Sequence, residues 1–270
     1  AATQIGLPCL LHEQNAVLSR VNRLLAPKVG AIAASFADTA GLGEADRRKL
    51  TLVGNPVREA IVAVRGVPYT APQPNVPLRV IVLGGSQGAN VMSDVVPSAL
   101  IQLPPEIRAR IRLTQQCRPE DIDRVRTIYS ESGIAADLAA FVEDVPALLA
   151  AAHICITRAG ASTVAELTSA GRPALLVPYL HATDDHQTAN ARAMVTAGGA
   201  FLMPQAKFTP SALRQSLEAL FRDPPSLVRM AVAARELGRP RAARDLVDLA
   251  ERLVGANGAT PPAVAGRVAA

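Results

Sequence analysis

The chain of 270 residues has no tryptophan, and aromatic residues make up only 3% of it. Proteins that bind single-stranded nucleic acid stack the bases on aromatic side chains, and few are present here. The sequence also lacks long basic runs, although its formal net charge is +5 and its pI is about 9.6. Nucleic acid is therefore not an expected partner. The basic balance suits a phosphorylated substrate or an anionic membrane face.

Cysteine and long apolar runs are scarce as well. Cys9, Cys117 and Cys155 form an odd set without the spacing of a metal site, and the last two fall in or at the end of apolar runs. We expect buried reduced thiols, as in a cytosolic protein. No stretch reaches the roughly 18 apolar residues of a membrane span, and the N-terminus lacks the charged start of a signal peptide. A soluble or peripheral protein is expected.

From residue 79 onward, short apolar runs alternate regularly with helical patterns. Asp144 is placed as a helix N-cap, and Gly133, Gly171 and Gly198 are placed as helix stops. Strands separated by helices pair in parallel through right-handed crossovers. The pattern therefore predicts an α/β fold with a Rossmann-like, doubly wound parallel sheet. The expected strands are residues 80–83, 111–115, 138–142, 153–157, 174–178 and 200–203.

The N-terminal part predicts a second unit with few strands. Its apolar runs are residues 8–11, 29–34 and 51–54. These are too few for an independent sheet of this type, so we expect an incomplete first domain, a Pro-rich linker, a complete second domain and a disordered tail. The expected boundaries are 1–62, 63–78, 79–254 and 255–270.

The segment 84–89, GGSQGA, follows an expected strand and opens a helix. Glycines there let a phosphate approach the backbone N–H groups, although they also fit a simple tight turn. The segment is neither a dinucleotide GxGxxG nor a P-loop. The next strand ends in Gln115 and Gln116, not in the acid that binds a ribose in NAD enzymes. NAD and ordinary nucleotide triphosphatases are therefore disfavoured.

A second turn, GAST at residues 160–163, follows the strand expected at 153–157, and Glu166 comes one helical turn later. The turn offers N–H and hydroxyl donors for a diphosphate, and a carboxylate offers two acceptor oxygens for the vicinal hydroxyls of a ribose. Thr163 and Glu166 also fit a T-x-x-E capping box, which needs no ligand. The sequence leaves both interpretations open.

The segment 184–190, DDHQTAN, opens the following helix. Asp184 and Asp185 fit an N-terminal cap, and no third ligand for a metal is evident, so no metal or other cofactor is expected. Gln187 and Asn190 are three residues apart and share one helix face, where their amides can read sugar hydroxyls.

The tetrapeptide HEQN at residues 12–15 ends the first expected strand. We expect it to face a cleft between domains, where His12 or Glu13 transfers a proton or positions an acceptor. The alternative is that Gln14 or Asn15 caps the next helix. Arg58, in the sequence GNPVR, is placed to meet a phosphate or to brace the hinge.

Basic and apolar residues alternate in the helix that follows. The basic residues are Arg20, Arg23 and Lys28, and the apolar ones are Val21, Leu24 and Leu25. The pattern fits a membrane-surface anchor, but a solvated helix face is the favoured interpretation.

Six motifs in order, HEQNAV, VGNPVR, VLGGSQGA, FVEDV, RAGASTVAEL and PYLHATDDHQTANA, resemble the bacterial MurG family from about Pro8 to about Glu251. The resemblance implies two Rossmann-like domains of the glycosyltransferase-B (GT-B) type, the first incomplete here. It implies an inverting transferase that moves GlcNAc from UDP-GlcNAc to the C4 hydroxyl of MurNAc in lipid I, giving lipid II. It also implies a role in peptidoglycan synthesis, and so in cell-wall biogenesis, cell shape and cell division.

The partners implied by the resemblance are UDP-GlcNAc, undecaprenyl-pyrophosphoryl-MurNAc-pentapeptide (lipid I) and an anionic membrane surface. The implied location is peripheral, on the cytoplasmic side of the bacterial inner membrane. Family members begin with a GGTGGH loop whose histidine is a candidate general base, and this chain is expected to lack that N-terminal part. Two alternatives remain open: a UDP-GlcNAc-binding half that needs a partner for the lacking part, and a UDP-GlcNAc 2-epimerase with a similar double sheet.

The resemblance also implies roles for single residues. Val142 would meet the uracil through its backbone, and Glu166 would bind the ribose hydroxyls. Glu13, with His12, would face the acceptor, and Arg58 would lie on the hinge side of the donor pocket. The contacts to the diphosphate and sugar would come from Ser86, Ala161, Ser162 and Thr163, those to the GlcNAc hydroxyls from Gln187 and Asn190, and a further substrate contact from Asn15.

Overall fold

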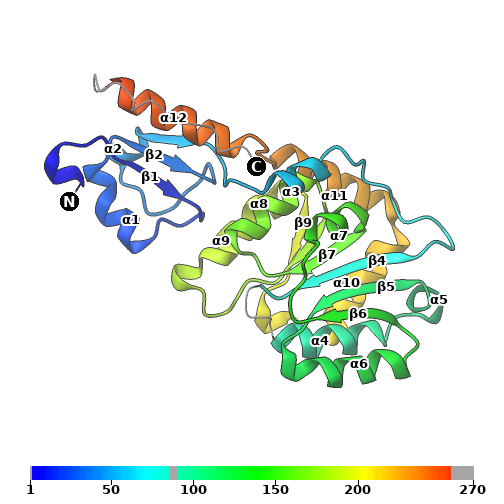
Figure 1. Cartoon of the computed structure of the whole chain (residues 1–270). Helices are drawn as coiled ribbons and strands as arrows, with labels where there is room; N and C mark the ends of the chain where they lie inside the picture. The colour runs from blue at the N-terminus through cyan, green and yellow to red at the C-terminus, as the bar shows by residue number, and fades with distance from the viewer. Residues whose placement is uncertain (1, 86–89, 257–270) are drawn as a thin grey trace, which may run out of the picture. The chain divides into compact units, whose positions relative to one another are not determined.

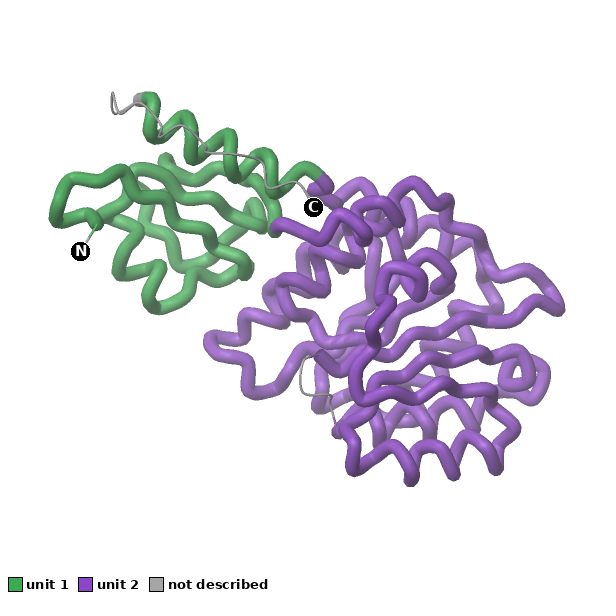
Figure 2. The backbone as a smooth tube through the Cα atoms, viewed as in Figure 1, with its two compact units in different colours: residues 1–55, 241–270 green, residues 56–240 purple. Residues whose placement is uncertain are grey.

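The computed structural model describes residues 2–85 and 90–256 (Figure 1). The chain divides into two compact units, one of residues 1–55 with 241–270 and one of residues 56–240 (Figure 2). These boundaries differ from those expected at residues 62 and 79. The last helix, expected in the second domain, belongs to the first unit because its leucines pack on the sheet there.

Within the described residues, the larger unit contains six parallel strands in the order β6-β5-β4-β7-β8-β9. Counted from the start of this unit, the order is 3-2-1-4-5-6, that of a Rossmann sheet. The predicted doubly wound parallel sheet is confirmed. The strands are β4 (Leu78–Leu83), β5 (Ile111–Gln116), β6 (Ala135–Ala139), β7 (Ile154–Thr157), β8 (Ala174–Leu176) and β9 (Ala200–Leu202).

Helices cover both faces of this sheet. α4, α6 and α10 pack together on one face, and α3, α7 and α8 pack together on the other, with α11 against α8 (Figure 1). Strand β4 shows why, since Leu78, Val80 and Val82 lie on one face and are buried in one core cluster, while Ile81 on the other face is 3% exposed. The helices are α3 (Glu59–Val64), α4 (Asn90–Leu100), α5 (Pro105–Arg108), α6 (Ile122–Glu131), α7 (Val145–Ala151), α8 (Ala161–Ala170), α9 (His186–Thr196), α10 (Pro210–Arg222) and α11 (Pro224–Leu237).

Local signals placed several helix ends correctly. The Asp144 carboxylate accepts from the N–H of Ala147 at 2.9 Å and caps α7, and Gly171 ends α8 with a φ of 65°. The strand expected at 138–142 is wrong, because β6 runs from Ala135 to Ala139. Buried Ile134 anchors the start of β6 directly after Gly133, and the chain leaves the sheet before Phe141, which is 75% exposed.

The smaller unit is built on three parallel strands within its described part, β1 (Leu10–Glu13), β2 (Ala31–Ala34) and β3 (Leu50–Leu52), in that order. Helix α12 (Ala242–Ala256) packs on β2, where Ala31 and Ala33 meet Leu249. On the opposite face, Ile32 packs against Leu18. The other helices of this unit are α1 (Arg20–Leu25) and α2 (Glu44–Arg47). In the described parts of the chain, no helix is long and apolar enough to cross a membrane.

Candidate functional site

The strand order of the larger unit reverses between β4 and β7. Open α/β sheets bind ligands in the crevice beyond the carboxyl ends of the strands at such a switch point. β4 is followed by Gly84 and by Gly85, whose φ of 89° favours glycine. The predicted contact Ser86, with the rest of the segment 86–89, lies outside the described residues.

Helix α8 begins three residues after β7, and its first turn is uncapped. Its N-cap is Gly160, which has no side chain to make a capping bond, and the first helical bond runs from the N–H of Val164 to the oxygen of Gly160 at 3.0 Å. The N–H groups of Ala161, Ser162 and Thr163 therefore have no acceptor within the helix, and the helix dipole favours an anion there. The capping-box interpretation is wrong, because Thr163 lies inside the first turn and not at the N-cap.

Glu166 lies one turn further along α8 and pairs with Arg58. The distance from Arg58 Nη2 to Glu166 Oε1 is 3.4 Å, and the glutamate side chain is 24% exposed. Arg58 is the N-cap residue of α3. Burial raises the pKa of Glu166 above its ordinary value, and the arginine partly opposes this shift. The structure thus brings together Arg58 and Glu166, two residues that are far apart in the sequence and were both predicted to contact the sugar-nucleotide donor.

Gln187 and Asn190 reach from α9 to the turn between β7 and α8. The Gln187 Oε1 accepts from the N–H of Ala159 at 3.3 Å and from the N–H of Tyr179 at 2.9 Å. The Asn190 Nδ2 donates to the oxygen of Ala159 at 3.1 Å, and Asn190 is fully buried. Both residues share one face as predicted and brace this turn. Their contacts with a sugar stay predictions.

The two acids before α9 do not cap it. Asp185 is its N-cap residue but makes no side-chain capping bond, and Asp184 and Asp185 have φ values of 52° and 50°. The expected cap is therefore wrong, and both residues occupy the strained left-handed region. His186 Nδ1 donates to the oxygen of Thr183 at 2.7 Å. Among the described residues, no three His, Cys, Asp or Glu side chains gather as a metal site.

Arg158 is a residue of this site that the sequence reasoning missed. It follows β7 directly and is only 9% exposed, and burial lowers the pKa of its guanidinium. Its Nη1 donates to the oxygens of Val177 and Pro178, both at 3.2 Å, and to Gln205 Oε1 at 2.7 Å, while the guanidinium lies 5.4 Å from the ring centre of Tyr179. Arg158 therefore ties the β7 turn to the loops after β8 and β9. The sequence did carry a signal for this residue, because Arg158 is a charged residue at the end of the apolar run 153–157.

Val142 lies between β6 and α7 and is half-buried, next to the exposed side chain of Phe141. This places it beyond the carboxyl end of β6, at the same edge of the sheet as the start of α8. The contact of its backbone with a uracil stays a prediction.

In the smaller unit, His12 and Glu13 lie within β1 and not beyond it. His12 Nε2 donates to the oxygen of Gly54 at 3.0 Å. Glu13 is 2% exposed. Its carboxylate accepts from the N–H groups of Asn15 at 2.9 Å and Ser19 at 2.8 Å and from the Nδ2 of Asn22 at 2.9 Å.

These contacts make Glu13 a brace of the connection between β1 and α1. The roles of His12, Glu13 and Asn15 toward an acceptor stay predictions. The interpretation of Gln14 or Asn15 as a helix cap is wrong, because α1 begins later and is capped by Ser19, whose Oγ accepts from the N–H of Asn22 at 3.2 Å.

Comparison with known proteins identifies the family of this chain. Residues 79–248 match the glycosyltransferase family 28 C-terminal domain. The UDP-N-acetylglucosamine--N-acetylmuramyl-(pentapeptide) pyrophosphoryl-undecaprenol N-acetylglucosamine transferase of Paramagnetospirillum magneticum is 53% identical over 254 residues, which cover 94% of this chain and 68% of that protein. The crystal structure of Acinetobacter baumannii MurG matches with a TM-score of 0.78 and 30% identity, over 93% of this chain and 69% of that one.

A more distant solved structure, the UDP-GlcNAc 2-epimerase of Neisseria meningitidis bound to UDP-GlcNAc, matches with a TM-score of 0.62 over 93% of this chain and 71% of that one. Its identity of 16% shows a likeness of fold alone. The chain spans about two thirds of its curated relatives, 68% and 65% of the first two. The GT-B fold and the resemblance expected from the motifs are both confirmed, and the chain belongs to the MurG family of bacterial N-acetylglucosamine transferases, within glycosyltransferase family 28.

Proposed function

We propose that this chain provides the donor site of an inverting transferase that moves GlcNAc from UDP-GlcNAc to the C4 hydroxyl of MurNAc in lipid I. The observation that carries the proposal is the uncapped start of α8 at the switch point, with Glu166 one turn behind it. The N–H groups of Ala161, Ser162 and Thr163 would meet the diphosphate, and the Glu166 carboxylate would accept from the ribose diol.

In this proposal the acceptor hydroxyl attacks the anomeric carbon in line, and negative charge develops on the departing UDP. Donors fixed before the reaction stabilise that charge without reorganising. Each contact with a helix dipole contributes about 0.3–1 kcal/mol when exposed. The start of α8 and the Arg58 guanidinium therefore have to act together.

Calorimetry with UDP tests the donor site directly on this chain. We expect Glu166→Ala to weaken binding by about tenfold or more, because hydrogen bonds to a charged group contribute about 1.5–3 kcal/mol. Glu131→Ala is the matched control. Glu131 is also a helical glutamate, but it is exposed and is the last residue of α6, whereas Glu166 lies near the start of α8. An unchanged dissociation constant for Glu166→Ala would contradict the proposal.

The transfer reaction needs its own assay, because the chain spans only part of its relatives. Transfer to a soluble lipid I analogue is measured with this chain alone and with the N-terminal part of a relative added. Turnover by the chain alone would exclude the alternative of a binding half that needs a partner. Formation of the manno-epimer of UDP-GlcNAc without acceptor would favour the epimerase alternative.

For the lipid acceptor, we propose peripheral binding to an anionic membrane on the cytoplasmic side of the inner membrane. In the smaller unit, Val21 and Leu24 of α1 are 65% and 69% exposed, beside exposed Arg20, Arg23 and Lys28. Apolar side chains ringed by cations suit an anionic lipid surface.

Flotation with anionic vesicles at low salt tests the surface, and Val21→Ser with Leu24→Ser should reduce the bound fraction. The matched control is Val247→Ser, since Val247 on α12 is 55% exposed. Equal flotation of the variant and the control would leave α1 as a solvated helix face.

A further inference from the structure

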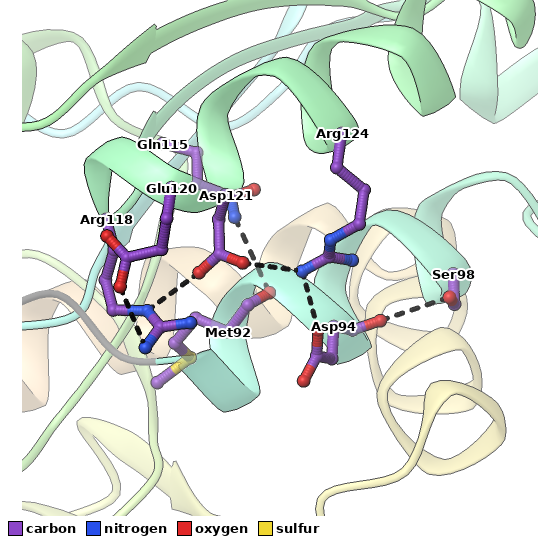
Figure 3. A network of polar contacts seen from close by, with 8 residues as sticks. All are labelled: Met92, Asp94, Ser98, Gln115, Arg118, Glu120, Asp121 and Arg124. Carbon is purple, nitrogen blue, oxygen red and sulfur yellow. Dashed lines mark hydrogen bonds and ion pairs between the residues drawn. The ribbon is translucent and has the colours of Figure 1, made fainter.

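A network of charged side chains joins the carboxyl end of β5 to helix α4 (Figure 3). At its centre is Asp121, at the end of the short 3-10 helix η3 (Pro119–Asp121), with a side chain only 7% exposed. Its Oδ2 accepts from Arg118 Nε at 2.8 Å, and its Oδ1 accepts from Arg124 Nη2 at 2.9 Å. Glu120 lies 3.1 Å from Arg118 Nη1.

Arg124 extends the network to a second element. Its Nη2, already bonded to Asp121, also lies 2.7 Å from Asp94 Oδ1 on α4. One guanidinium nitrogen thus bridges two carboxylates, one on the segment after β5 and one on α4. Figure 3 shows the two acids on either side of that nitrogen.

An uncharged side chain, that of Gln115, also connects β5 to α4. Gln115, the fifth residue of β5, is fully buried, and its Nε2 lies 3.5 Å from the oxygen of Met92 on α4. Its Oε1 accepts from the hydroxyl of Tyr129 on α6 at 2.6 Å, which fixes the direction of the amide. The first turns of α4 are therefore held from β5 and α6 at two points, Met92 and Asp94.

The position of α4 makes this attachment relevant to the ligand site. α4 is the helix that follows β4, so its first turns lie beyond the carboxyl end of β4, on one side of the switch point. Bound phosphates meet N–H groups at the helix start after such a strand. A small rotation of α4 would misdirect these groups, and productive contacts tolerate only small misplacements.

An ordinary ion pair within α6 differs from this network, because it does not join two elements of the fold. Arg126 and Asp123 of α6 lie 2.6 Å apart, but both are on α6 and exposed, so their pair fixes nothing outside that helix. The hydrogen bonds from Arg118 and Arg124 also hold the pKa of Asp121 below its ordinary value, so this carboxylate stays charged at neutral pH.

We propose that Asp94, Asp121 and Arg124 are positioning residues for the nucleotide: they hold the first turns of α4 in the orientation that binds the diphosphate. The inference rests on the proposed donor site. It assigns to α6 and the segment after β5 a function in binding that acts through α4 and needs no direct contact with the nucleotide.

The test compares UDP binding by calorimetry in Arg124→Gln and Asp94→Asn with the matched controls Arg126→Gln and Asp123→Asn. We expect about a three- to tenfold rise in the dissociation constant for the first two variants and no rise for the controls. A rise of this size corresponds to the coupling free energy that networks of this kind carry. Asp94→Glu keeps the carboxylate and should bind nearly as the wild type does. Asp94 is 50% exposed, so its substitution leaves the core intact even if Arg124→Gln impairs folding.

Hydrogen exchange provides a readout that general destabilisation would not give. In Asp94→Asn, amides of α4 should exchange faster while those of β7 and β8 keep the wild-type rate, since local opening follows local contacts. Uniformly faster exchange, or unchanged UDP binding in both network variants, would overturn the inference. If the wild-type chain did not bind UDP, or if Glu166→Ala bound UDP normally, the proposed donor site itself would be overturned.

Discussion

Arg58 and Glu166 are 108 positions apart in the sequence, yet Nη2 of the arginine lies 3.4 Å from Oε1 of the glutamate. The arginine side chain is 59% exposed and the glutamate 24%. A pair this exposed contributes about 0–1 kcal/mol, so a ligand can replace it at little cost. In the proposed donor site, the ribose diol takes the carboxylate and the diphosphate takes the guanidinium, so the pair holds both groups in place for the nucleotide.

The first prediction concerns the pH dependence of UDP binding. Burial raises the pKa of Glu166 above 4.5, and Arg58 opposes the shift. Only the ionised carboxylate offers all its acceptor sites to the diol. Affinity should therefore fall on acidification at a higher pH than an ordinary glutamate would give, and Arg58→Ala should move this fall to still higher pH.

Calorimetry across the acid range measures this dependence. Glu166→Gln is the control, because its binding carries only the titration of the nucleotide itself and of other groups. Superimposable pH profiles for Glu166→Gln and the wild type would contradict the prediction.

The second prediction concerns Arg172, which is 1% exposed and has no carboxylate partner among the described residues. Its guanidinium donates to the carbonyl oxygens of Val67, Leu149, Ala150, Ala170 and Gly171. The last turns of α7 and α8 supply three of these oxygens and the C-cap Gly171 of α8 a fourth, at helix ends where the dipoles favour a cation. Arg172→Met should lower the free energy of unfolding by about 3 kcal/mol or more, because buried carbonyls lose their donors.

Urea unfolding followed by circular dichroism measures this loss. Arg172→Lys should lie between the methionine variant and the wild type, since it keeps the charge but not the five donors. The matched control is Arg192→Met on α9, where the arginine is exposed. Similar unfolding midpoints for Arg172→Met and the control would show that the buried guanidinium contributes little.

The third prediction is a pH dependence of stability from His153. Burial, and then Arg79 and Arg110, lower the pKa of this imidazole below 6.5, and its Nδ1 accepts from the N–H of Arg79 at 2.9 Å. The unfolded chain takes up the proton first as pH falls through 6.5. The free energy of unfolding should therefore decrease from pH 6.5 downward until the folded imidazole also becomes protonated.

His153→Asn keeps an acceptor for the N–H of Arg79 and cannot titrate, so its stability should be flatter over this range. Unfolding midpoints at a series of pH values check the difference. His181→Asn, in an exposed loop, should keep the wild-type slope. The same slope in His153→Asn would assign the acid sensitivity to other groups.

The fourth prediction separates the bracing role of Gln187 from a contact with sugar. Gln187→Glu keeps an oxygen for the N–H groups of Ala159 and Tyr179 but removes the amide donor. If the donor reads a GlcNAc hydroxyl, affinity for UDP-GlcNAc should fall about tenfold more than affinity for UDP, since an unmatched polar group costs about 1–3 kcal/mol.

The ratio of the two dissociation constants is the measurement. The terminal phosphate of UDP ionises twice and that of UDP-GlcNAc does not, so the added negative charge alone would weaken UDP binding more. A larger loss for UDP-GlcNAc would therefore come from the lost donor. Gln102→Glu, an exposed position just after α4, is the control. A ratio equal to that of the wild type would leave Gln187 with its bracing role alone.

Much of the larger unit was predictable because its signals are local. A short apolar run marked β4, Asp144 marked the start of α7, and Gly171 marked the end of α8. Each of these depends on neighbours within one turn or one strand. The parallel sheet followed, because strands that alternate with helices leave few other topologies.

The sequence by itself thus determined the order of the elements, the family and the glycine turns where a phosphate would bind. Only the tertiary structure decided which side chains meet. The pair of Arg58 with Glu166, the bridge from Arg124 to Asp94, and the contacts of Arg158 each join different elements of the fold. The burial of Glu13 and Asn190 was also decided there. Such contacts depend on how crossovers bring elements together, and no local propensity encodes that geometry.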